Sequence, residues 1–213
     1  MSKYFSYFPQ TYYNLEDEKT NVDVVTNIMS KFSFEPDFKN NSVVYYQYAV
    51  TDGETPEMLA HKIYGSSERH WVILSMNDIV NPLIDWPLEQ NSLIGMIDKK
   101  YESYANTANG FTGLEWAREN IHSYYKEIIQ TSGETGEKFN DIIQIDSDTF
   151  ANVSNADSTY TLHNGKTIRI DTIKYNKTYY EYEVEQNDNK RLIKILKPEF
   201  VQTVEDEFRK VFN

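Results

Sequence analysis

Residues 43–82 read VVYYQYAVTDGETPEMLAHKIYGSSERHWVILSMNDIVNP, and this stretch decides how the chain folds. Its opening run, VVYYQYAV, is rich in β-branched and aromatic side chains, which predicts a strand. Asp52 and Gly53 then mark a turn. Thr55 can cap a helix that has Pro56 at its first position, where the missing N–H costs nothing. We therefore expect a strand that leads through a tight turn into a helix.

Two short helices are expected after that turn. The first carries an apolar stripe at helical spacing and a left-handed stop at Gly65; the stripe consists of Leu59, Ala60, Ile63 and Tyr64. The second begins at Ser66 or Ser67, and its apolar residues recur at three- and four-residue steps: Trp71, Val72, Leu74, Met76 and Ile79. The run closes at Pro82, so the order is strand, helix, helix and an irregular exit.

Upstream, residues 1–42 are expected to form an extended aromatic N-terminal arm with a short helix. Aromatic side chains crowd its start: Tyr4, Phe5, Tyr7, Phe8, Tyr12 and Tyr13. Apolar residues at helical spacing within 22–34 predict the short helix, and Pro36 ends it. Such an arm either packs back on its own domain or is buried on a partner, and the sequence leaves both possibilities open.

Downstream, the apolar run 93–97 is the candidate for a strand that returns to the first one. Residues 114–129 carry apolar side chains at helical spacing. Further along, apolar residues recur at every second position, most completely over 180–185, where Tyr and Val alternate with Glu. A turn leads on to 192–196, so we expect a hairpin within a small antiparallel meander. Pro198 opens a final helix that needs a surface to lie on.

These elements predict the α+β class. The chain has 213 residues, enough to bury a substantial core. We divide it into the arm, residues 1–42, a small domain, 43–100, and a C-terminal part, 101–213. That last part is expected to hold a helix, a small antiparallel sheet and a docking helix.

Composition excludes several classes of protein. There are 33 Asp and Glu against 21 Lys and Arg, a formal net charge of −12, so the chain lacks the basic surplus that nucleic-acid binding needs. It has no cysteines, which excludes disulfides, thiolate nucleophiles and Cys-ligated zinc. No apolar run is long enough for a membrane span, and no signal-peptide pattern opens the chain. We expect a soluble protein that is made in a cytoplasm and has no nucleic-acid or membrane partner.

Catalytic motifs are absent from the sequence: it contains no HExxH, GxSxG, GxxxxGK[ST] or GxGxxG. Carboxylate pairs such as Glu115 and Glu119 are better explained as solvated helix faces, because so many residues are acidic. We therefore expect no enzyme, no cofactor and no metal. The 17 tyrosines instead suit surfaces that a partner covers.

A known family pattern runs through the first stretch. The matching residues are YAVTDGET at 48–55, Leu-Ala and Ile-Tyr-Gly in the first helix, Trp-Val-Ile in the second, and NDIVNP at 77–82. On these residues the stretch 46–82 resembles a LysM domain. The resemblance implies a small βααβ fold whose loops form a shallow groove for N-acetylglucosamine-containing glycans. Carried over, that groove would involve Asp52, Gly53, Glu54, Thr55 and residues 77–83.

Further features extend the likeness over most of the chain: Tyr7-Phe8-Pro9 in the arm, RHWVI at 69–73, DWPL at 85–88, and KRLIKILKP at 190–198 before the last helix. Together they resemble the LysM-containing baseplate wedge subunits of T4-like contractile-tailed bacteriophages. This resemblance implies a non-enzymatic protein of the virion tail baseplate, assembled in the host cytoplasm. It also implies that the LysM-like module joins neighbouring wedges around the hub of a sixfold baseplate.

Two functions of different classes follow from these likenesses. The first is a structural baseplate wedge protein whose partners are other wedge and hub proteins. The second is a LysM glycan-binding protein that attaches to peptidoglycan. Interface or groove candidates for either function are Tyr7, Phe8, Asp52, Gly53, Thr55, Asn81, Pro82 and Trp86. An arm, a lone small domain, a sheet and a docking helix are more exposed parts than one compact fold requires, which favours the first function.

Overall fold

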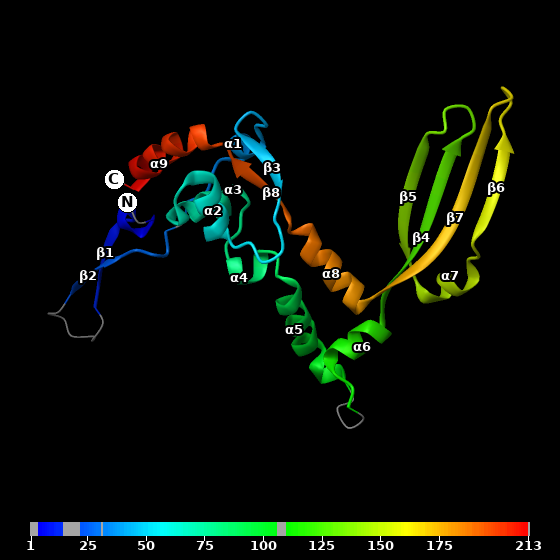
Figure 1. Cartoon of the computed structure of the whole chain (residues 1–213), viewed down its shortest axis with the longest axis horizontal. Coiled ribbons are helices and arrows are strands. Elements are labelled where there is room, and N and C mark those ends of the chain that lie inside the picture. Colours follow the sequence, from blue (N-terminus) through cyan, green and yellow to red (C-terminus); the bar gives the residue numbers. More distant parts are fainter. Residues whose placement is uncertain (1–3, 15–21, 31, 106–109, 213) are drawn as a thin grey trace. The chain divides into compact units, whose positions relative to one another are not determined.

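The computed structural model describes residues 4–14, 22–30, 32–105 and 110–212 (Figure 1). The chain forms two compact units. Unit 1 combines residues 1–90 with 187–213, and unit 2 comprises 91–186. Both units mix helices with antiparallel strands, so the α+β class is confirmed.

Unit 1 is built around a two-stranded sheet whose strands lie far apart in the sequence. Its described elements are η1 (Tyr4–Tyr7), β1 (Gln10–Tyr13), β2 (Asp23–Thr26), α1 (Pro36–Asn40), β3 (Tyr45–Ala49), α2 (Pro56–Tyr64), η2 (Ser67–Arg69), α3 (His70–Met76), α4 (Pro82–Asp85), β8 (Leu192–Leu196) and α9 (Pro198–Phe212). β3 pairs antiparallel with β8, with Tyr45 opposite Leu196 and Ala49 opposite Leu192. The order β3, α2, α3, β8 is therefore a βααβ arrangement closed by the end of the chain.

The predicted returning strand at 93–97 is wrong. These residues lie in the middle of helix α5 (Gln90–Tyr101), and Leu93, Ile97 and Tyr101 are its buried side chains. They recur every four residues, which is a helical stripe rather than a strand face. β8 takes the place that we expected 93–97 to fill.

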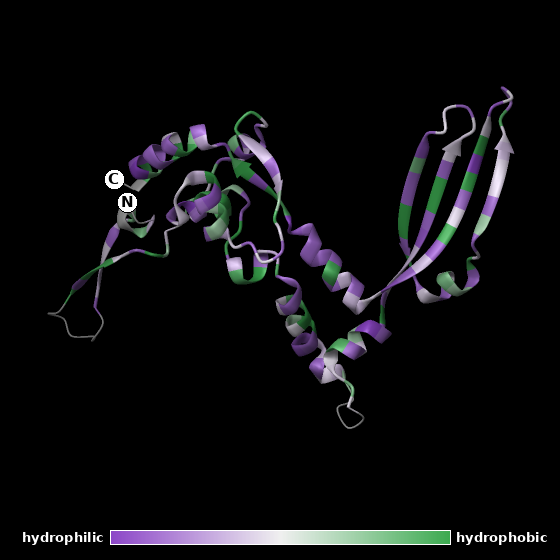
Figure 2. Cartoon of the chain, in the orientation of Figure 1, coloured by the Kyte–Doolittle hydropathy of each residue, from purple (hydrophilic) through white to green (hydrophobic). Residues whose placement is uncertain are grey.

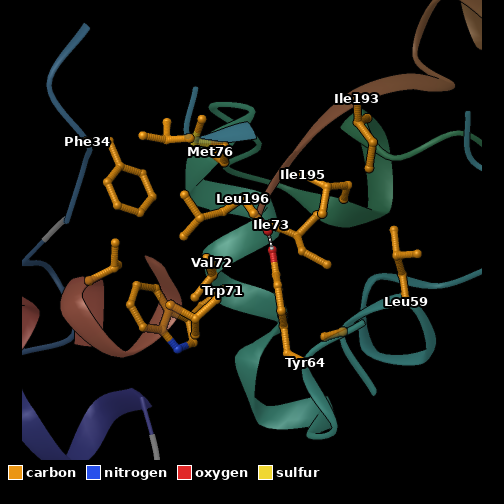
Figure 3. Packing of buried hydrophobic residues seen from close by; sticks show 14 of the residues in the cluster. Phe34, Leu59, Tyr64, Trp71, Val72, Ile73, Met76, Ile193, Ile195 and Leu196 are labelled. Carbon is orange, nitrogen blue, oxygen red and sulfur yellow. Dashed lines mark hydrogen bonds between the residues drawn. The ribbon is translucent and has the colours of Figure 1, made fainter. Parts of the chain in front are cut away.

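The predicted caps of α2 are confirmed. The Thr55 side chain accepts a hydrogen bond from the backbone N–H of Met58, and Gly65 ends the helix with a φ of 72°. α2 and α3 pack on the β3–β8 sheet, and their apolar stripes form a central part of the core, as Figure 3 shows for Leu59, Val72, Ile73 and Met76. The buried Tyr64 hydroxyl donates to the carbonyl oxygen of Leu196 at 2.9 Å, which ties α2 to the end of β8.

The base of the N-terminal arm packs on its own unit. Phe8 is only 5% exposed, and its ring centroid lies 5.9 Å from that of Phe208 in α9. Tyr4 contacts both Phe208 and Trp71, at centroid distances of 5.3 Å in each case. Trp71 and Phe208 lie 4.8 Å apart, so the two chain ends and α3 share one aromatic cluster.

The short helix predicted within 22–34 is wrong. Residues 23–26 form strand β2, which pairs with β1 from Gln10 opposite Thr26 to Tyr13 opposite Asp23. The sequence of β2, DVVT, is rich in β-branched residues, and a pairing partner decides such a segment in favour of a strand. Tyr12 and Tyr13 on this hairpin are exposed.

Unit 2 carries a four-stranded antiparallel sheet in the order β5-β4-β7-β6. Its described elements are α5, η3 (Glu102–Tyr104), α6 (Gly113–Glu119), β4 (Ile121–Ser132), β5 (Lys138–Ile145), α7 (Ser147–Asn152), β6 (Ala156–Thr161), β7 (Thr167–Thr178) and α8 (Tyr179–Asn189). The predicted helix at 114–129 is thus right only to Glu119. β-branched and aromatic residues then dominate, and the chain continues as β4.

The strand predicted at 180–185 is also wrong, because these residues lie in α8. Thr178 and Glu181 form reciprocal hydrogen bonds, each side chain accepting from the backbone N–H of the other, which start a helix. The Glu183 carboxylate is buried and accepts hydrogen bonds from the Tyr101 hydroxyl at 2.7 Å and the Lys100 ammonium at 2.6 Å. The helix cap and the hydrogen-bonded, buried Glu183 carboxylate therefore favour a helix here, although the residues alternate as in a strand.

The C-terminal helix has the predicted surface to lie on. In α9, Val204 and Phe208 are buried and Val201 joins them, whereas Val211 is 66% exposed. We expect Phe208→Ala to lower the free energy of unfolding by about 3–5 kcal/mol, because it opens a cavity between the arm, α3 and α9. Urea unfolding followed by tryptophan fluorescence measures this.

Val211→Ala is the matched control on the same helix and should change the free energy of unfolding by about 0.5 kcal/mol or less. Equal effects of the two substitutions would contradict the assigned packing of α9.

Candidate protein interaction surface

Trp86 fills the space beside the turn that follows β3. Its side chain is 6% exposed, and its Nε1–H donates to the carbonyl oxygen of Glu54 at 2.8 Å. A tryptophan is buried well when its ring is covered and its N–H has a partner, and both conditions hold here. The sequence singled out Trp86 as an interface or groove residue, and the structure gives it a packing role within unit 1.

Asp52 and Gly53 form the tip of the same turn. The Asp52 carboxylate pairs with the Arg191 guanidinium at 3.0 Å, just before β8 begins. Gly53 has a φ of 75°, a left-handed conformation that favours glycine. The turn is thus shaped by its backbone and fixed to the segment that leads into β8.

Thr55, Asn81 and Pro82 act at helix starts. Thr55 caps α2, while the Asn81 side chain caps α4 by accepting from the N–H of Leu83 at 3.1 Å. Pro82 occupies the first position of α4. The structure therefore brings the predicted groove residues to one end of the module but uses most of them in its own turns and caps.

The other two candidates belong to the arm. Phe8 is buried against Phe208 and is part of the core of unit 1. Tyr7 closes η1, and its side chain lies outside the described residues.

Asn77, which the resemblance placed near the groove, also has a structural role. Its side-chain Nδ2 donates to the carbonyl oxygen of Lys194 at 2.8 Å, and its Oδ1 accepts from the Lys194 N–H at 2.7 Å. The amide group thus pairs with β8 as a neighbouring strand would.

Residues 77–83 were expected near the groove, but sequence reasoning did not predict that apolar side chains at and after this segment are exposed. Val80, Leu83 and Ile84 are 68%, 85% and 64% exposed, and we call them the α4 surface. Helix α4 is only one turn long, so no periodic stripe could reveal it. The signal that was available is the placement of apolar residues on both sides of an Asn-Pro helix start.

An open groove of about 480 Å³ adjoins the α4 surface at Val80. Its apolar walls come from the arm, α3 and the segment after α3: Tyr4, Phe5, Phe32, Trp71, Leu74, Ile79 and Val80. Two acidic residues, Glu68 and Asp78, also line it. Exposed apolar surface bordered by polar groups is typical of a site that binds another protein.

Glu54 carries the clearest electrostatic feature near this surface. Burial opposes its ionisation, but hydrogen bonds from Lys62, Tyr48 and Thr51 outweigh burial and lower the pKa of the carboxyl below its ordinary value. The Tyr48 hydroxyl lies 2.9 Å and the Lys62 ammonium 3.1 Å from the carboxylate. The hydrogen bonds around the turn after β3 therefore favour the ionised form of Glu54.

These surfaces define the class of the protein. Among the described residues no group of three His, Asp or Glu side chains is placed to hold a metal, and no helix is long and apolar enough to cross a membrane. What the described part of unit 1 offers is apolar contact area and a firmly held scaffold. Exposed apolar area on a firmly held scaffold is typical of proteins that bind other proteins.

The comparisons define the family. A family model described as base plate wedge protein 53 matches residues 3–211, and the chain belongs to this family. It is similar to the baseplate wedge protein gp53 of Enterobacteria phage T4, with 26% identity over 151 residues. The matched region covers 70% of this chain and 64% of that relative, which is less than two thirds of the relative's length. The chain is thus a structural baseplate wedge protein, a component of the virion tail.

We expect the stability of unit 1 to fall in acid through Glu54. A carboxyl whose folded-state pKa is lowered stabilises the fold above its unfolded-state pKa, and this contribution disappears as the pH falls through the folded-state pKa. Glu54→Gln should therefore lower the free energy of unfolding near neutral pH and reduce the further loss in acid. Urea unfolding at about pH 7 and about pH 4 tests both effects.

Glu57→Gln is the matched control, because Glu57 is an exposed carboxylate on the neighbouring helix α2. It should leave the acid loss of the parent protein unchanged. Identical pH profiles for the two variants would show that the hydrogen bonds to Glu54 contribute nothing to folding.

Proposed function

We propose that this wedge protein joins neighbouring baseplate wedges through a LysM-like module that has become a protein-binding scaffold. The module consists of β3, α2, α3 and β8. Its partners would be the other wedge proteins and the hub proteins of a sixfold tail baseplate, which assembles in the host cytoplasm.

The order and pairing of the elements support a LysM-like module. Two antiparallel strands enclose two short helices in the sequence, and α2 and α3 bury their apolar stripes against the sheet. The LysM-like sequence pattern of 46–82 covers β3, α2 and α3 of this arrangement. Its second strand comes from residues 192–196, so unit 2 is an insertion between α3 and the last strand.

One observation carries the choice of a protein partner. Trp86 and Arg191 pack against the turn where a LysM groove would be open, whereas the side chains of Leu83 and Ile84, three and two residues before Trp86, are exposed to solvent. A site filled by its own chain has little room for a sugar ring. Two large apolar side chains side by side suit a protein surface that covers them.

Binding to peptidoglycan, the other function considered from the sequence, is not favoured. A glycan groove presents free hydrogen-bonding groups, but Asp52 is paired with Arg191 and both Thr55 and Asn81 cap helices. A pull-down on purified peptidoglycan should therefore give no saturable binding. Retention that free chitooligosaccharide competes away would contradict the proposal.

We expect the double substitution of Leu83→Asp and Ile84→Asp to weaken binding to a wedge assembled from proteins of the same phage. Two charges in a covered apolar contact cost at least about 2 kcal/mol, which is on the order of a 30-fold loss of affinity. Co-sedimentation with the purified wedge measures the loss, and circular dichroism establishes that the variant is folded.

Met58→Asp is the matched control. Met58 is a large apolar residue that is 59% exposed on α2, and an acidic side chain is well tolerated in the first turn of a helix. This variant should bind the wedge as the parent protein does. Unchanged binding of the α4 double variant would move the interface away from the α4 surface.

A further inference from the structure

The four-stranded sheet of unit 2 ends in two uncovered edges. β5 and β6 are its outer strands. Every side chain of β6 is exposed, as is every side chain of β5 except Ile145, so nothing in the described chain shields these strands. An outer strand presents unpaired N–H and C=O groups that can accept another strand.

Neither edge is interrupted by a proline or a bulge, and the charged residues on the two strands are few: Lys138 and Asp141 on β5 and Asp157 on β6. Figure 2 shows hydrophobic and hydrophilic residues interspersed along the sheet, and the strand register puts charged residues on both faces, Asp141 and Lys126 on one and Glu127 and Arg169 on the other. Neither face is therefore a purely apolar surface that would select a covering layer. The two outer strands are therefore better candidates for a binding site than either face of the sheet.

The two edges present aromatic side chains on the same face. Phe139 lies opposite Gln130, Gln130 opposite Ile170, and Ile170 opposite Ser158, so these residues share one face. Tyr160 is two residues from Ser158 and points to that face as well. Phe139 and Tyr160 are 67% and 55% exposed.

We propose that β5 of one copy pairs with β6 of the next, so that the sheets of unit 2 join head to tail. All neighbouring strands in the sheet are antiparallel, so β5 and β6, three positions apart, run in opposite directions. When a second copy continues the sheet in the same order, its β5 is therefore antiparallel to β6 of the first copy. Placing Phe139 opposite Tyr160 pairs the whole of β6, from Lys138 opposite Thr161 to Ile143 opposite Ala156.

Charge favours this pairing over the pairing of two β5 edges. In the head-to-tail register Asp141 lies opposite Ser158 and Asp157 opposite Ile142, so the two carboxylates point to opposite faces. Full-length pairing of β5 with β5 would place the two Asp141 carboxylates directly or diagonally opposite each other. Like charges at such positions destabilise a sheet.

The absence of cysteines in the sequence allows a direct test with the full chain. A Phe139→Cys variant mixed with a Tyr160→Cys variant should form a disulfide-linked heterodimer under mild oxidation. The same two substitutions in one chain should give a ladder of multimers. Within one copy these positions lie three strand spacings apart, about 14 Å, too far for an internal disulfide.

The collision control is a mixture of the Met58→Cys and Leu192→Cys variants, whose parent side chains are 59% and 61% exposed. Head-to-tail pairing predicts cross-linking on the order of tenfold or more faster than this control, because pairing raises the effective concentration of the thiols. A rate equal to the control would overturn the proposal. Faster linking of Phe139→Cys to itself would also overturn it, in favour of identical edges.

A second measurement needs no cysteine. Phe139→Lys places a charge on β5 and leaves the β6 edge intact, whereas Tyr160→Lys places a charge on β6 and leaves the β5 edge intact. By light scattering, each variant alone should be monomeric, and the mixture should form one-to-one dimers through the two intact edges. Failure of the mixture to associate under conditions in which the parent chain associates would contradict head-to-tail pairing.

Discussion

The pairing of β3 with β8 is the contact on which unit 1 depends. It joins residues 45–49 to residues 192–196 and so closes a very long loop, at a cost in chain entropy that rises slowly with loop length. Buried apolar contacts repay this cost, because Ile193, Ile195 and Leu196 lie in the same core as α2 and α3. Without β8, the stripes of both helices would lose the surface that they cover.

Side chains on both sides of β8 hold this strand in register. The Tyr64 hydroxyl reaches the carbonyl oxygen of Leu196, and the Asn77 amide pairs with Lys194. Just before the strand, the buried Asn187 amide exchanges hydrogen bonds with the backbone of Leu88, at 2.7 and 3.0 Å. The entry to unit 2 and the exit from it are thus tied together within unit 1. A wedge protein built in this way can carry an inserted sheet without giving up its scaffold.

The sequence predicted the elements that local signals define. Thr55, Pro56 and Gly65 mark the limits of α2 whatever lies around it, so that helix was predicted correctly. The partner of β3 was not, because nothing local connects residues 45–49 to a strand so far along the chain. At 180–185 the alternation of Tyr and Val with Glu wrongly predicted a strand. The interactions that decide for a helix are the cap at Thr178 and the contacts of Glu183, which only the folded chain brings together.

The candidate site was predicted in part for the same reason. The sequence placed several candidate residues around the turn after β3, but whether a tryptophan there is buried in its own fold or lines an open groove depends on a long-range hydrogen bond such as that from Trp86 to Glu54. The exposure of Leu83 and Ile84 likewise follows from the path of the chain around a one-turn helix rather than from any periodic pattern.

The most direct test of this account is a variant in which residues 91–186 are replaced by a short Gly-Ser linker between Gln90 and Asn187. If β3–β8 pairing makes unit 1 a complete folding unit, the variant will unfold cooperatively in urea, and the amides of β3 and β8 will be protected together from hydrogen exchange. A chain without a cooperative transition, or with exchanging amides throughout 45–49 and 192–196, would contradict the account.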